Sequence, residues 1–192
     1  MWRPPECTAT GGFFLLVGWF AVSCGWETAL MVLGAAAFHE LGHLLALRCV
    51  HARVRRLHLS ALGAVMEVGG AMGYGQELAA VLAGPLASLL AAVVLGGRGH
   101  VTAAGANAVL CAFNLLPIRP LDGGRGLYLL LAWLAGPSAA EWVCRRVGIC
   151  AALAVGTGAV RLMVRTGGSL WLLPAAGGLL LSALGLFDGG RG

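Results

Sequence analysis

Three side chains within one five-residue stretch have the types and spacing to hold a metal ion and activate water. His39 and His43 are four positions apart, and Glu40 directly follows the first histidine. On a helix, side chains four residues apart project from one face, so both imidazoles can reach a single divalent metal. Glu40 stays close enough to act on a water bound to that metal, as in zinc hydrolases. We interpret the histidines as metal ligands and Glu40 as a catalytic base.

The sequence around this motif is apolar, which strengthens the interpretation. Between Thr28 and Leu47 the chain carries no ionisable residue outside the motif, and a run of this length can cross a bilayer. A His-Glu-x-x-His sequence on a soluble helix is often an accident of surface residues. Inside a membrane, ionisable groups are costly and usually functional. The motif therefore predicts a metal site within a membrane-spanning helix.

A third protein ligand is expected, because a hydrolytic zinc site normally has three and leaves the fourth position for water. Asp122 is the strongest candidate among the acidic residues, since it follows Pro117 and Pro120, which together must interrupt a helix. Irregular backbone at membrane depth is tolerated inside protein or beside water. We predict one zinc ion per chain, held by both histidines and Asp122. Glu67 and Asp188 are the alternatives.

The composition predicts an all-α, polytopic membrane protein. Of its 192 residues, 59% are hydrophobic and 11% are charged, and the mean hydropathy is +0.86, outside the range of ordinary soluble proteins. An apolar start could be a cleaved secretory signal, but a second apolar run follows it almost at once, so we favour a first span. We expect a single transmembrane domain over residues 1–192, with about six spans at 11–26, 28–50, 76–95, 101–116 continuing as 125–135, 147–164 and 170–187.

A short segment between the second and third spans predicts strands. Over residues 54–68, Leu57 and Leu59 alternate with Arg56 and His58, and this period of two favours strand over helix. Glycines around it make a helix less favourable still. We predict a small β-hairpin at the membrane surface.

The charges predict an orientation. The net charge of +5 arises from 13 arginines and no lysine, and the arginines lie at the ends of apolar runs rather than on one face. This distribution excludes nucleic acid as the expected partner and indicates a lipid bilayer. Alternating the spans from a cytoplasmic N-terminus places ten arginines inside and three outside. His39 precedes Arg48 by nine residues, so the metal would lie about 13 Å beneath the cytoplasmic surface.

A second motif, Asn-x-x-Pro-x-x-Pro-Leu-Asp-Gly-Gly over residues 114–124, accompanies the histidine motif. Together they resemble the site-2 protease family of intramembrane zinc metallopeptidases, and the six-helix plan is similar to its stage IV sporulation protein FB branch. The resemblance implies that His39, His43 and Asp122 bind zinc and that Glu40 is the catalytic base. It also implies that Asn114 lies near the scissile bond and positions the substrate.

The same resemblance implies a function and a location. It implies regulated intramembrane proteolysis of a membrane-tethered protein and, from the sporulation branch, an inactive sigma-factor precursor as the substrate. It places the chain in the bacterial inner membrane or the membrane around the forespore, with the active site open to the cytoplasm. Membrane inhibitor or regulator proteins are further candidate partners. We predict no CBS or PDZ domain, so the hairpin edge or a separate protein would select the substrate.

Two other functions are alternatives to proteolysis. A non-catalytic membrane protein of the same fold could serve as an assembly or regulatory partner. A metal transporter could use the same ligands in transit, but it would need further polar groups along its route. The other predicted spans are too apolar for that.

Overall fold

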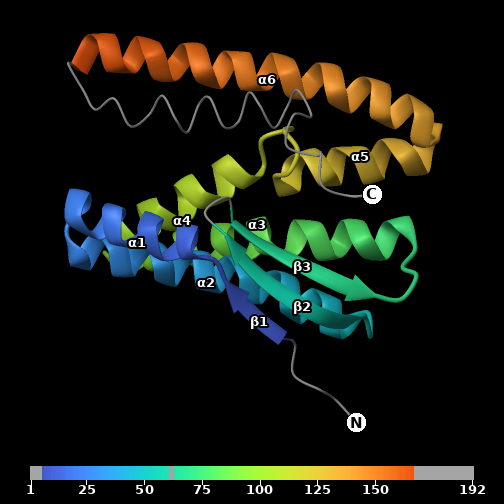
Figure 1. The fold of residues 1–192 in the computed structure, drawn as a ribbon, viewed down its shortest axis with the longest axis horizontal. Coiled ribbons are helices and arrows are strands. Elements are labelled where there is room, and N and C mark those ends of the chain that lie inside the picture. The colour runs from blue at the N-terminus through green and yellow to red at the C-terminus, as the bar shows by residue number, and fades with distance from the viewer. Residues whose placement is uncertain (1–5, 61–62, 167–192) are drawn as a thin grey trace. The chain divides into compact units, whose positions relative to one another are not determined.

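The computed structural model describes residues 6–60 and 63–166 and is mainly helical (Figure 1). It divides into two compact units, residues 1–112 and 113–192. The elements in chain order are β1 (Glu6–Ala9), α1 (Gly11–Cys24), α2 (Trp26–Cys49), β2 (Arg53–Ser60), β3 (Gly63–Gly69), α3 (Tyr74–Gly97), α4 (Val101–Asn114), α5 (Asp122–Ala135) and α6 (Pro137–Thr166).

Among the described residues, three helices are long and apolar enough to cross a membrane by length and composition. These are α2, α3 and the part of α6 from Pro137 to Arg161, and α4 is a shorter apolar helix. The lengths and compositions of these helices support the prediction of a membrane protein. The predicted number of about six spans and the single domain stay predictions, and the sixth span, 170–187, lies outside the described residues.

The first unit is built around the contact between α2 and α3, the most extensive helix–helix contact among the described residues. The two helices approach closely at Gly42, where an added Cβ would lie 2.7 Å from the Ala83 carbonyl oxygen and 2.8 Å from the Ala87 Cβ. Real side chains do not come this close, so only glycine allows the observed separation. α1 precedes α2 with a single-residue break at Gly25, whose φ of 84° favours glycine. The break therefore comes before the predicted boundary at residue 27.

The predicted β-hairpin is confirmed. β2 and β3 pair antiparallel, with Ser60 opposite Gly63 and Val54 opposite Val68, and a bulge between Val54 and Arg56. The strands cover residues 53–60 and 63–69, close to the predicted 54–68.

A third strand was not predicted. β1 pairs parallel with β2, which places it at the edge of a sheet with the order β1-β2-β3. A strand of four residues is too short to establish a period of two, so the sequence carries no strand signal here.

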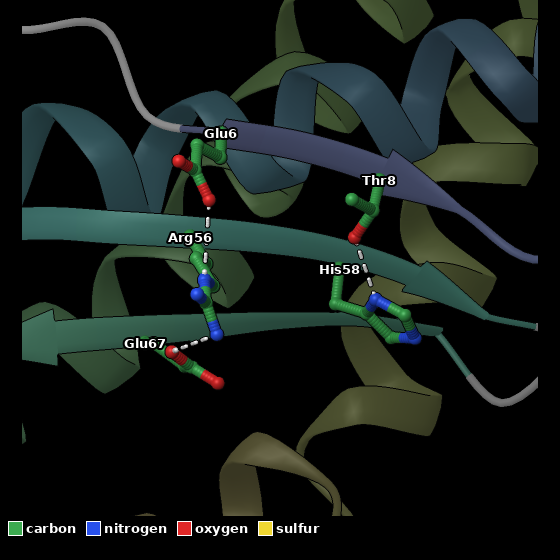
Figure 2. Close-up of polar contacts among 5 residues, drawn as sticks. All are labelled: Glu6, Thr8, Arg56, His58 and Glu67. Atoms are coloured by element: carbon green, nitrogen blue, oxygen red, sulfur yellow. Dashed lines mark hydrogen bonds and ion pairs between the residues drawn. The ribbon is translucent and has the colours of Figure 1, made fainter.

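Polar side chains connect the three strands on one face of this sheet (Figure 2). Arg56 of β2 lies between Glu6 of β1 and Glu67 of β3, with nitrogen–oxygen distances of 3.2 and 4.0 Å. The Thr8 hydroxyl lies 2.7 Å from His58 Nδ1. All these side chains are exposed, so the pairs add little to stability. Their positions do match the register in which Glu6 and Glu67 both lie opposite Arg56.

The second unit contains α5 and α6, which pack against each other, and the irregular segment 115–121 that precedes α5. The prolines open the helix as predicted. α5 resumes at Asp122, three residues before the predicted Arg125. The reason is close packing at the following glycines, where an added Cβ would lie 2.6 Å from the Leu116 carbonyl oxygen at Gly123 and 2.5 Å from the Ile118 carbonyl carbon at Gly124.

The segment 115–121 is also anchored to α5 and α6. Ile118 is fully buried, and the Arg119 guanidinium donates hydrogen bonds to the Glu141 carboxylate at 3.2 and 3.3 Å and lies 4.2 Å from the centre of the Tyr128 ring. The predicted fifth span, 147–164, lies inside α6, which starts earlier because Pro137 suits the first position of a helix. The irregular segment is thus a fixed part of the second unit.

Gly42→Ala tests the α2–α3 contact. The added methyl group overlaps Ala83 and Ala87, so we expect the free energy of unfolding to fall by about 1–3 kcal/mol. Thermal unfolding of the detergent-purified protein measures the change. Gly34→Ala is the matched control on the same helix, because nothing lies within 4 Å of its added Cβ. Since alanine favours helix over glycine by up to ~1 kcal/mol, the control should be neutral or slightly stabilised. Equal behaviour of the two variants would contradict this packing.

Candidate metal centre

The two histidines of the motif lie on one face of α2 and turn the same ring nitrogen toward each other. His39 Nε2 and His43 Nε2 are 3.2 Å apart, and the ring planes are inclined at 80°. His39 is buried, with 4% of its surface exposed, and His43 is half-buried. The predicted spacing therefore brings both imidazoles together in the interior of the first unit.

The other ring nitrogen of each histidine is anchored on α3. His43 Nδ1 lies 2.8 Å from the backbone carbonyl oxygen of Ala80, and His39 Nδ1 lies 3.0 Å from the hydroxyl oxygen of Ser88. A carbonyl can only accept, so His43 Nδ1 carries the hydrogen and donates it. In a neutral imidazole, this arrangement leaves the lone pair on Nε2, the nitrogen that faces His39.

The spacing of the two Nε2 atoms fits a shared zinc ion. Zinc–nitrogen bonds are about 2.0–2.1 Å long and zinc sites are tetrahedral, so two ligating nitrogens should be about 3.3 Å apart. The observed 3.2 Å agrees with this value. Ligating histidines also almost always donate their second N–H to an oxygen, as His43 does. The pair therefore suits a metal.

A glycine on α3 makes room for the His43 ring. A Cβ added at Gly84 would fall on the imidazole, 2.5 Å from Cε1 and 2.7 Å from Cδ2. No side chain larger than hydrogen fits beside the ring in this position. Gly84 thus allows the His43 ring of α2 to lie directly against α3.

The remaining predicted residues are placed as follows. Glu40 lies on α2 beside His39 and is half-buried; Asn114 ends α4 and Asp122 begins α5, and both are half-buried. Asp122 belongs to the second unit, whereas the histidines belong to the first. By residue type, two imidazoles and one carboxylate are a candidate set of zinc ligands.

Glu67 and Asp188 are the alternatives to Asp122 as the third ligand. Glu67 is an exposed residue on β3 that faces Arg56, so it takes part in the polar face of the sheet. Asp188 lies outside the described residues. The roles of Glu40, Asn114 and Asp122 stay predictions.

Known proteins resemble this chain in sequence and fold. The provisionally named zinc metalloprotease Rip3 of Mycobacterium tuberculosis is 32% identical over 132 residues, which cover 60% of this chain and 33% of that protein. Stage IV sporulation protein FB of Bacillus subtilis is 33% identical over 117 residues, covering 55% of this chain and 41% of that protein. The chain therefore spans about a third to two-fifths of the length of these relatives. No protein-family profile matches it.

A solved structure gives the fold. The site-2 protease from Methanocaldococcus jannaschii matches with a TM-score of 0.70 at 20% identity, over 96% of this chain and 93% of that one. The chain thus has the site-2 protease fold and resembles this family in sequence. The family resemblance inferred from the two motifs is thus confirmed, and the site-2 protease fold accounts for the helices and the small sheet.

Some residues that contact the histidines cannot be recognised in the sequence. Ser88 and Ala80 contact His39 and His43 from α3, yet their types and spacing carry no metal-site signal. A serine in an apolar helix is common, and the role of Ala80 belongs to its backbone. A polar residue four positions after Gly84 was the one available hint.

Gly84→Ala tests whether the His43 ring needs the space beside Gly84. The added methyl group displaces the imidazole, so we expect metal affinity to fall about tenfold or more, in the range typical of changes next to a ligand. Zinc content per protein after dialysis against a weak chelator measures the effect. Gly75→Ala on the same helix has nothing within 4 Å of its added Cβ and should keep its zinc. Full zinc occupancy in Gly84→Ala would show that the ring does not need this space.

Proposed function

We propose that this chain is an intramembrane zinc endopeptidase that cleaves a membrane-tethered protein. The observation that carries the proposal is the histidine pair on an apolar helix, with both Nδ1 atoms anchored and the Nε2 atoms 3.2 Å apart. The names of the relatives support it, since Rip3 is named as a zinc metalloprotease and the solved structure as a site-2 protease. An apolar setting supports peptide bonds within or beside the bilayer as the substrate class.

In this proposal one zinc ion binds His39, His43 and Asp122. The carboxylate is suited to the third position because it opens α5 directly after the irregular segment 115–121, where backbone and side chains are fixed by packing. A bound zinc ion supplies Lewis acidity, which lowers the pKa of a water ligand to about 7 and polarises a substrate carbonyl.

Glu40 is the proposed general base. Its position beside His39 keeps its carboxylate next to the ligands without using it as one. Glu40 takes a proton from the attacking water as the new carbon–oxygen bond forms. It then returns that proton to the leaving nitrogen as the carbon–nitrogen bond breaks, so the reaction consumes one water and regenerates the carboxylate.

Substrate binding involves two further elements in this proposal. Asn114, at the end of α4, holds the backbone of the substrate near the scissile bond through its amide. The sheet offers edge strands β1 and β3, and an unwound substrate segment can add to such an edge through backbone hydrogen bonds.

We further propose the location and the biological substrate. The chain is placed in a bacterial inner membrane or the membrane around the forespore, with its active site open to the cytoplasm, because the basic residues cluster after α2. The similarity to stage IV sporulation protein FB supports a role in sporulation. For that role we propose a sigma-factor precursor as the substrate and membrane regulator proteins as partners.

Glu40→Gln separates catalysis from metal binding. The amide cannot take the proton, so cleavage of a co-expressed membrane-tethered reporter should fall about 10²–10⁴-fold while zinc content stays at the wild-type level. Immunoblotting of the released fragment and metal analysis measure the two effects. Glu27→Gln, an exposed change in the first turn of the same helix, should leave both unchanged. Undiminished cleavage by Glu40→Gln would contradict the catalytic role of Glu40 and favour a role of this chain as a non-catalytic partner.

Asp122→Ala tests the third ligand. Loss of one of three protein ligands should reduce zinc content after dialysis to well below one ion per chain and abolish cleavage. The control is Glu67→Ala, which removes the exposed carboxylate on β3 and should retain zinc. If Asp122→Ala kept its metal while Glu67→Ala lost it, the third ligand would be Glu67.

A further inference from the structure

One face of α3 touches the histidine pair at three positions spaced four residues apart. Ala80 provides a carbonyl oxygen, Gly84 provides an open surface, and Ser88 provides a hydroxyl. The histidines are themselves four residues apart on α2. Residues at this spacing form a row along one side of a helix, so two such rows lie against each other.

Ser88 is the one side chain of this row that makes a polar contact with a histidine. Its side chain is fully buried, and its hydroxyl oxygen lies 3.0 Å from His39 Nδ1. In a membrane helix, water does not compete for this contact. A hydroxyl can donate or accept, so it can receive a hydrogen from Nδ1. That arrangement leaves the Nε2 lone pair of His39 directed toward His43.

We propose that Ser88 is a positioning residue that sets the tautomer and ring orientation of His39 for metal binding. The two histidines then have matched roles: the Ala80 carbonyl fixes His43, and the Ser88 hydroxyl fixes His39. The His39 ring depends more on a hydrogen-bond partner from the protein, since it is more deeply buried than the His43 ring. Without the hydroxyl, the hydrogen can move to Nε2, where it blocks the ligand position. This inference rests on the proposed zinc function of the pair.

The test uses the 192-residue chain in detergent and the metal alone as the probe. Zinc affinity is measured by competition with a chelator, and the apo protein's thermal unfolding is measured in parallel. Ser88→Ala should bind zinc about 10–100-fold more weakly, as is typical when a hydrogen-bond partner of a ligand is removed. The unfolding midpoint of the apo protein should stay near that of the wild type.

A second readout reports the ligands directly. The visible spectrum of the cobalt-substituted protein depends on ligand identity and geometry, so Ser88→Ala should shift or weaken its bands. Ser88→Thr keeps the hydroxyl and should restore affinity and spectrum. Ser88→Cys keeps a similar volume but hydrogen-bonds weakly, so it should behave like Ser88→Ala.

The matched control removes a hydroxyl that serves no histidine. Thr157 on α6 donates to the carbonyl oxygens of Leu153 and Ala154 at 2.9 and 3.0 Å. Thr157→Val should therefore bind zinc and cobalt like the wild type.

The outcomes separate this inference from the proposed function. Wild-type affinity and spectrum in Ser88→Ala would overturn the positioning role. A loss of zinc affinity that accompanies a lower unfolding midpoint of the apo protein, and that Ser88→Thr does not restore, would also overturn the positioning role. If zinc binding depended on Ser88 as expected but the wild type cleaved no membrane protein, the protease function would fail and the positioning role would stand. If the wild type bound no zinc, both would fail.

Discussion

The close approach of α2 and α3 is the constraint on which the first unit depends. At Gly42 the backbone of α2 comes within van der Waals reach of Ala83 and Ala87, and at Gly84 the His43 ring lies against the backbone of α3. Both contacts need glycine, one on each helix. In a bilayer, lipid tails are as apolar as the side chains they surround, so helices associate through tight packing and hydrogen bonds. Glycine thus serves both purposes, since Gly42 lets the helices pack closely and Gly84 leaves space for the His43 imidazole.

Much of the fold could be predicted because its signals are local. The period of two in Arg56, Leu57, His58 and Leu59 predicted the hairpin, and the prolines at 117 and 120 predicted the break before Asp122. β1 was missed, since four residues give almost no periodic signal and its pairing with β2 joins residues about fifty positions apart. The start of α5 was placed three residues late. Its true position depends on Gly123 and Gly124 fitting against a loop, which the sequence does not reveal.

The histidine pair could be predicted for the same reason, since its geometry follows from spacing on one helix. Its surroundings could not. Ser88 and Ala80 come from a different helix, and which residues of α3 face α2 depends on the rotation of one helix against the other. An alanine that acts through its carbonyl carries no chemical signal in its side chain. The residues that orient ligands are therefore harder to find in a sequence than the ligands.

The row at residues 80, 84 and 88 also affects how this site tolerates changes in chain length. Each residue turns an α-helix by about 100°, so inserting or deleting one residue between Ala80 and Ser88 would rotate one end of the row away from α2. One of the two histidines would then lose its anchor while the other kept it, although every original side chain was still present. Loops on the sheet side can vary in length without this effect. We therefore expect evolution in this part of the chain to have proceeded by substitution within a fixed count of residues.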